Sequence, residues 1–114
     1  MSVSFVARAI AALSITFATT SFAGAALSSA HVLAVRVDAT GSGIIFFDQS
    51  FVGTPATCAQ PGYQSALAFN ATTGKSALAM ALTAKATGSA VEVYGTGACG
   101  VYGVVEDYSY GVLH

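Results

Sequence analysis

Residues 31–47 read HVLAVRVDATGSGIIFF, and this stretch decides the fold class. Leu33, Val35 and Val37 occupy alternate positions, and a period of two is typical of a half-buried strand. The ATGSG segment that follows carries two glycines, which favour turns because they adopt positive φ angles without strain. The closing IIFF is β-branched and aromatic, as strands are. The stretch predicts a β-hairpin whose first strand buries these three side chains and exposes the polar ones.

The rest of the chain predicts one helix set between further strands. Residues 72–87 are rich in Ala and Leu, so we expect a helix that Thr72 or Thr73 caps and Gly88 ends. Strands are expected at 65–69, at 90–94 with Val91 and Val93 inward, and at 101–113 with a bulge near Glu106; residues 48–64 form a long loop. The predicted fold is mainly β with one helix, in the order β-β-β-α-β-β.

The first 25 residues, MSVSFVARAIAALSITFATTSFAGA, predict a cleaved secretory signal peptide. Arg8 precedes an apolar run, and Ala23-Gly24-Ala25 fits the A-x-A cleavage pattern. Ser and Thr dilute the run below the roughly 20 apolar residues that a transmembrane helix needs, which leaves a retained anchor as the lesser alternative. We expect cleavage after Ala25 and one secreted or periplasmic domain at 26–114 with no membrane span.

Charged residues are scarce, at 8% of the chain. Because Arg8 falls in the leader, three Lys and Arg remain against five Asp and Glu. Nucleic-acid binding depends on several cations that neutralise phosphates. The composition therefore argues against nucleic acid as a partner.

Two cysteines, Cys58 and Cys99, remain in the expected mature domain. An even pair in a small exported domain predicts a disulfide. The alternative is a metal site that adds His31 and His114, but no recognisable ligand spacing supports it. We expect the disulfide, with no metal and no cofactor.

Two glycine motifs resemble nucleotide-binding loops. GTGACG at 95–100 satisfies G-x-G-x-x-G, but a strand rather than the required helix is expected after it. GKS at 74–76 lacks the glycine five residues earlier, where Phe69 stands. We therefore expect a tight turn at 95–100, a solvated Lys75 in the first turn of the helix, and no phosphate site.

The sequence offers no catalytic constellation. The two histidines lie near the ends of the expected domain and accompany no nucleophile motif. Glu106 and Asp107 are adjacent, so on a strand they face opposite sides and do not form an acid–base pair. We expect both carboxylates to be solvated surface charges, and we expect a protein that is not an enzyme.

Tyrosines are the strongest candidates for ligand contacts. Tyr94, Tyr102, Tyr108 and Tyr110 cluster in the last third of the chain, and Tyr63 stands in the long loop. Rings with a polar hydroxyl are typical of recognition surfaces and stack against sugars, whereas the simpler explanation is that tyrosine is a good strand residue. The first four are our candidate ligand-binding residues.

The predicted order of elements is that of the OB-fold, a partly open five-stranded barrel. In sequence, GKSALAMALTAKATG followed by VEVYGTGAC and then by Tyr102 and Glu106 resembles a group of small exported bacterial proteins. These proteins are related in architecture to the glycan-binding B subunits of pentameric toxins of the subtilase-cytotoxin type. The resemblance implies an OB-like barrel that binds glycans and forms a ring; no recognisable sialic-acid motif accompanies it.

The first functional hypothesis is therefore a non-enzymatic binding module for glycans, with a homo-oligomer as a possible assembly. The second is a structural domain that binds an envelope protein through an edge strand. A small hydrolase is third.

Overall fold

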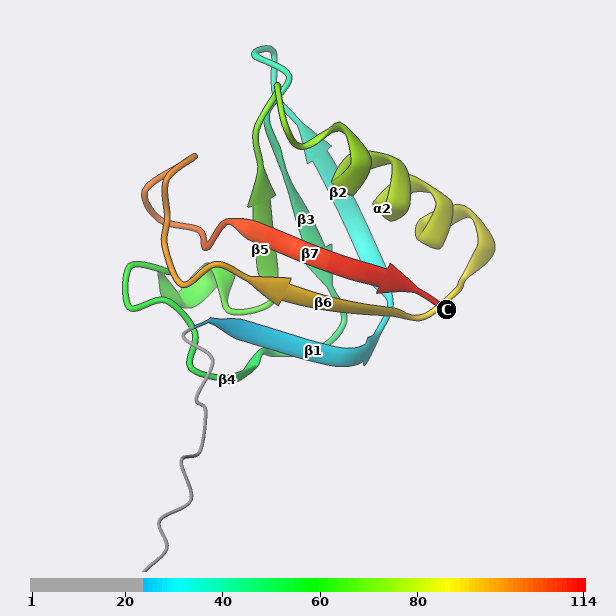
Figure 1. Cartoon of the computed structure of the whole chain (residues 1–114), viewed down its shortest axis with the longest axis horizontal. Helices are drawn as coiled ribbons and strands as arrows, with labels where there is room; N and C mark the ends of the chain where they lie inside the picture. The colour runs from blue at the N-terminus through cyan, green and yellow to red at the C-terminus, as the bar shows by residue number, and fades with distance from the viewer. Residues whose placement is uncertain (1–23) are drawn as a thin grey trace, which may run out of the picture.

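The computed structural model describes residues 24–114, in which the chain folds into seven strands and one α-helix (Figure 1). The elements are β1 (Ala25–Ala30), β2 (Val32–Val37), β3 (Gly43–Phe47), β4 (Val52–Gly53), the 3-10 turn Pro61–Tyr63, β5 (Ala66–Phe69), α2 (Lys75–Thr87), β6 (Val91–Gly95) and β7 (Tyr108–Leu113). Apart from Gly24 and Ala25, the expected leader lies outside the described residues.

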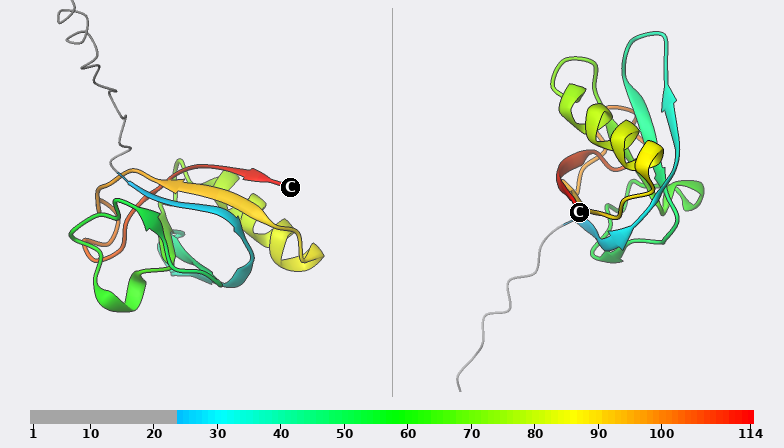
Figure 2. Two further views of the ribbon diagram at one scale, coloured as in Figure 1. Left: turned by 90° about the horizontal axis from the view of Figure 1, so that it is seen from below. Right: turned by 90° about the vertical axis from the view of Figure 1, so that its right-hand side faces the viewer.

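The strands form two antiparallel sheets that one bent segment connects. The first sheet has the order β4-β1-β6-β7 and the second has the order β2-β3-β5. Only His31 separates β1 from β2, so the chain passes directly from one sheet into the other at this bend (Figure 2). One isolated parallel bridge, between Ala68 and Asp107, joins the second sheet to the segment that leads into β7.

The mainly β fold with one helix is confirmed, whereas a five-stranded barrel is not. Residues 24–114 contain seven strands in two sheets that do not close into a barrel. The barrel stays open because a single bridge joins β5 to the segment that leads into β7. The two additional strands are β1 and the two-residue β4, which pair with each other at Ala25–Gly53 and Ala26–Val52.

The predicted hairpin is confirmed in its pairing but only in part in the face that it buries, where Val35 is half-buried and packs against the core. β2 pairs with β3 from Val32–Phe47 to Val37–Gly43. However, Val32 is buried while Leu33 and Val37 are 56% and 53% exposed. The register shifts between Val32 and Ala34, and this irregularity turns the alternation away from the phase that the sequence indicates.

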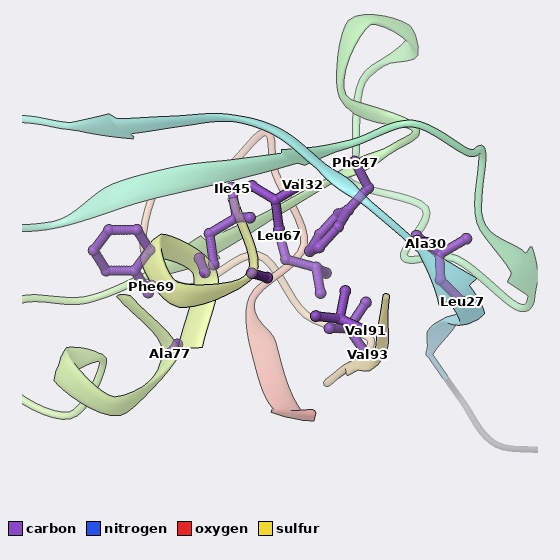
Figure 3. Close-up of a cluster of buried hydrophobic side chains, with 12 residues drawn as sticks. Leu27, Ala30, Val32, Ile45, Phe47, Leu67, Phe69, Ala77, Val91 and Val93 are labelled. Carbon is purple, nitrogen blue, oxygen red and sulfur yellow. The ribbon is translucent and has the colours of Figure 1, made fainter. Parts of the chain in front are cut away.

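The main core lies between the two sheets and the inner face of α2 (Figure 3). Val91 and Val93 of β6 are fully buried, as predicted, and meet Phe47 and Leu67 from the second sheet. The helix contributes Ala77, Ala81 and Ala84. These small side chains let the helix approach the sheets closely, and Leu82 on its outer face is exposed.

The helix ends where the sequence predicts but starts later. Gly88 is the C-cap in the left-handed conformation, and its N–H donates to the carbonyl of Ala84. The N-cap is Gly74 rather than Thr72 or Thr73. Those two residues belong instead to a turn in which the side-chain oxygen of Asn70 accepts their backbone N–H groups.

The last predicted strand, 101–113, is wrong in its first half. Residues 101–105 form turns and β7 starts only at Tyr108.

The predicted disulfide between Cys58 and Cys99 is confirmed, with a Cα–Cα distance of 6.2 Å. It ties the long loop after β3 to the turn after β6, and it excludes a metal site that uses these cysteines.

Candidate functional site

A concave surface lies between α2 and β7. It consists of two adjoining hollows of about 360 and 540 Å³, which share Ser76, Tyr108 and Ser109. The helix supplies one wall and β7, the edge strand of its sheet, supplies the other (Figure 1). We call this feature the α2–β7 groove.

Polar and apolar groups share the lining of the groove about equally, and most of the polar ones are hydroxyls. Its polar residues are Asn70, Thr73, Ser76, Thr83, Thr96, Asp107, Tyr108, Ser109 and Tyr110. No Lys or Arg is among the described lining residues, and Asp107 is the one carboxylate. Such a surface suits an uncharged ligand with many hydroxyl groups, because each hydroxyl both donates and accepts hydrogen bonds.

The four candidate tyrosines do not gather on one face. Tyr108 is half-buried, packs against the main core and points its hydroxyl toward Met80 of α2, so it lies on the helix side of β7. Tyr110 is 52% exposed and borders the same groove, but its ring points to the outer face of the sheet, because the adjacent Gly111 faces Met80 of α2. Tyr94 is the cross-strand partner of Tyr110, and their rings stack at 4.5 Å between centroids. These three are neighbours, whereas Tyr102 lies elsewhere.

The Tyr94 hydroxyl donates to the carboxylate of Glu92 on the same strand. This hydrogen bond, with burial second, raises the pKa of Tyr94 to about 12. Tyr94 stays protonated at physiological pH. Its hydrogen bond to Glu92 orients the Tyr94 ring, which stacks on Tyr110.

Tyr102 belongs to a separate polar cluster at the β2–β3 hairpin. Its hydroxyl donates to Asp38, which also accepts two hydrogen bonds from the Arg36 guanidinium, at 2.7 and 3.0 Å. The guanidinium lies 5.6 Å from the Tyr102 ring centroid. The cluster joins β2 to the turn that follows Cys99.

This cluster makes a testable pH prediction. The Arg36 hydrogen bond, and after it the Tyr102 hydroxyl, lower the pKa of Asp38. The stabilisation from this carboxylate is thus present above its unfolded pKa and is lost as the pH falls through its lower folded pKa. Tyr102→Phe is expected to raise the Asp38 pKa in a carboxyl-carbon NMR titration, whereas Leu33→Ala leaves it unchanged. An unchanged value in Tyr102→Phe would refute this assignment.

Glu106 contradicts the expectation of a solvated surface charge, because it is 0% exposed. Its Oε2 accepts the N–H groups of Ala25 and Gly97, both at 2.9 Å, and its Oε1 accepts that of Ala56 at 2.7 Å. These groups replace the water that an exposed carboxylate would bind. A Cβ at Gly95 would lie 2.0 Å from Oε2, so the strand passes the carboxylate where only glycine fits.

Asp107 performs the same task for the glycine-rich turn and is half-buried rather than fully solvated. Its two oxygens accept the N–H groups of Gly100 and Val101. Within GTGACG, the N–H groups of Gly97 and Gly100 therefore point toward negative charge, at Glu106 and at Asp107. The next element after this segment is β7 rather than a helix, so the predicted turn is confirmed.

The histidines lie apart from the groove lining. His31 Nδ1 is 3.3 Å from Asp48, and His114 Nε2 is 3.5 Å from Glu92. Within residues 24–114, no three potential metal-ligating side chains come together. The same residues hold no helix of the length and apolarity that a bilayer crossing requires.

Comparison with known proteins places the chain in no group: no family model, curated protein or solved structure matches it. Function must therefore be argued from the geometry of the α2–β7 groove and from the burial of Glu106. The sequence pointed to Tyr108 and Tyr110 in the groove, but it did not reveal the hydroxyl-bearing residues of α2 that complete the lining.

Proposed function

We propose that this protein is an exported, non-enzymatic binding module that holds a neutral glycan in the α2–β7 groove. The observation that carries this proposal is the groove lining, in which the Tyr108 ring, with Tyr110 at the border, stands beside hydroxyls from both walls and no Lys or Arg is present. An aromatic ring among hydroxyl groups matches a sugar, which presents an apolar C–H face and a polar rim. The Cys58–Cys99 disulfide supports a secreted or periplasmic location, since disulfides persist in oxidising compartments.

A binding role rather than hydrolysis is favoured by the single carboxylate in the described groove lining. Glycoside hydrolysis normally uses two carboxyl groups across the scissile bond. Asp107 already accepts two backbone N–H groups, which commit its oxygens to the turn at 100–101.

We further propose that the fold is OB-like. If β1 and β2 are counted as two halves of one bent strand, the order β1/β2, β3, β5, α2, β6, β7 is that of the five-stranded OB arrangement. The parallel bridge at Ala68–Asp107 lies where its third and fifth strands would meet. OB-folds bind oligosaccharides and oligonucleotides, and the resemblance to pentameric toxin B subunits adds a ring as the expected assembly.

The test is a panel of neutral oligosaccharides titrated against wild-type protein and Tyr110→Ala. Loss of one stacking ring is expected to weaken binding about tenfold or more without lowering the melting temperature appreciably. Leu33→Ala is the matched control, since Leu33 is as exposed as Tyr110 but lies on the other sheet. Absence of binding across the panel, or equal weakening by both variants, would refute the proposal.

The free edge of β7 favours one second candidate, a domain that binds an envelope protein by strand addition. Among residues 24–114, β7 pairs with β6 alone. Because the His114 N–H donates to the Ala90 carbonyl, the N–H and C=O groups of Gly111 and Leu113 point away from β6. An extended partner segment would pair there. Crosslinking through β7 that persists in Tyr110→Ala, with no glycan bound by either protein, would favour this candidate.

A further inference from the structure

We propose that the leader is removed between Ala23 and Gly24, and that the new α-ammonium group of Gly24 pairs with the buried carboxylate of Glu106. This inference rests on the export part of the proposed function and is independent of the glycan. It differs from the sequence expectation, which places the cut after Ala25.

Ala25 is the first reason to move the cut. It is 2% exposed, starts β1 and pairs with Gly53 of β4. Its N–H donates to Glu106 Oε2. Cleavage after Ala25 would remove this donor and this strand pair from the folded domain. The motif Ser21-Phe22-Ala23 also has small residues at the two positions that signal peptidase inspects, so a cut after Ala23 satisfies the same rule.

Glu106 is the second reason, because its carboxylate is wholly buried without a cationic side chain. The ion pairs found within residues 24–114 involve Asp38, Asp48 and Glu92. Three backbone N–H groups satisfy its hydrogen bonds but carry no net charge. Since burial of an uncompensated charge is costly, a cation next to this carboxylate would stabilise the fold.

Gly24 is placed to supply that cation. A Cβ on Gly24 would lie 2.5 Å from the Gly95 carbonyl oxygen and 3.4 Å from Glu106 Oε2. The first distance is too short for a methyl group, but an ammonium that shifts by a few tenths of an ångström donates to both oxygens. Once the bond to Ala23 is cut, rotation about the Cα–C bond of Gly24 brings its nitrogen to that position.

Neighbouring contacts hold Gly24 in place for this rotation. Its carbonyl accepts the N–H of Thr54, at 3.3 Å, and the next N–H along the chain is held by Glu106. Only the nitrogen end of the residue is therefore free to turn. Glycine is the one residue that leaves the position beside Gly95 empty for an ammonium group.

The first experiment determines the N-terminus. The full chain is expressed in a bacterial host, and the product recovered from the periplasm or medium is analysed by intact mass and N-terminal sequencing. A product that starts at Gly24 is expected. Ser21→Glu should block this cut, although it leaves the Ala23-Gly24-Ala25 pattern intact. An exported product that starts at Ala26 would overturn the inference while export stands, and an uncleaved chain in the cytoplasm would overturn both.

The second experiment tests the ion pair by acetylating the exported product with acetic anhydride at neutral pH. Only a neutral amine reacts, so the Gly24 amine is expected to react at least about tenfold more slowly in the folded protein than in the reduced, unfolded protein. Exposed Lys75 and Lys85 serve as internal controls that label in both states. Equal reactivity of Gly24 in the two states would refute the pairing.

A Glu106→Gln product separates the ion pair from burial alone. Where this variant folds, the Gly24 amine should regain the reactivity that the carboxylate suppressed, and continued protection would mean that burial alone shields it. Where it does not fold, the pH dependence of wild-type labelling decides, because an ion pair raises the pKa of the Gly24 amine whereas burial alone lowers it. The glycan panel is a separate measurement, so failure of glycan binding leaves a Gly24 terminus untouched.

Discussion

Glu106→Ala is expected to lower the free energy of unfolding by at least about 3 kcal/mol, because it leaves two buried and one half-buried N–H group without their acceptor, at about 1–3 kcal/mol for each buried group. The groups belong to Ala25, Ala56 and Gly97, which lie in three separate segments. The variant also leaves a cavity where the fully buried side chain was. Domains of this size have total stabilities of about 5–15 kcal/mol, so the loss would be large.

Urea denaturation monitored by circular dichroism measures this loss. Glu106→Gln should cost less than Glu106→Ala, because the amide oxygen still accepts from one side while its NH₂ group faces a donor on the other. Glu92→Gln is the control, since Glu92 is a carboxylate on β6 that is only half-buried. A Glu106→Ala variant as stable as this control would contradict the role assigned to the carboxylate.

Strands with β-branched or aromatic residues were predictable from the sequence, and strands made of small residues were not. β3 and β6 carry Ile, Phe and Val in alternation or in a continuous apolar run, which is a strong local signal. β1 reads AALSSA and has little strand propensity of its own. It is a strand because β4 and β6 pair with it from either side, and no window of sequence contains that information.

The predicted extent of the last strand was wrong for the opposite reason, because a segment with high strand propensity forms a turn. Residues 101–105 include three valines and a tyrosine, which favour a strand. The turn forms instead because Asp107 accepts the N–H groups of Gly100 and Val101 and so folds the chain back on itself. A side-chain acceptor that competes with a strand ladder overrides propensity at such a place.

Half of the candidate site was accessible from sequence. Tyr108 and Tyr110 stood out as aromatic residues, but their separation from Tyr102 depends on where β7 begins. Glu106 could be suspected only from the two valines before it in a chain with few charges. Its partners are backbone groups as far as 81 residues away, and backbone groups leave no mark in composition.

Removal of the Cys58–Cys99 disulfide is expected to lower the free energy of unfolding by about 4 kcal/mol in the chain-entropy model, comparable with the loss of Glu106. The bond links residues 41 apart in sequence, so it restricts a long loop of the unfolded chain. The Cys58→Ala/Cys99→Ala double variant should also show a steeper dependence on urea, since its unfolded state exposes more surface. Loss of stability without that steeper slope would place the effect in the folded state instead.

The disulfide and Glu106 hold the same two loops, and their combined removal tests whether they act together. Ala56 and Gly97, which donate to Glu106, each precede a bonded cysteine by two residues. With the disulfide intact, the loops stay near each other even without the carboxylate. With both changed, the loops are held together by weaker links, such as the hydrogen bond from the Gln60 N–H to the Val104 carbonyl at 3.0 Å. We therefore expect the cost of Glu106→Gln to be greater in the cysteine-free background, by about 0.5 kcal/mol or more in a double-mutant cycle. Additive losses would show that the carboxylate and the disulfide stabilise the fold independently.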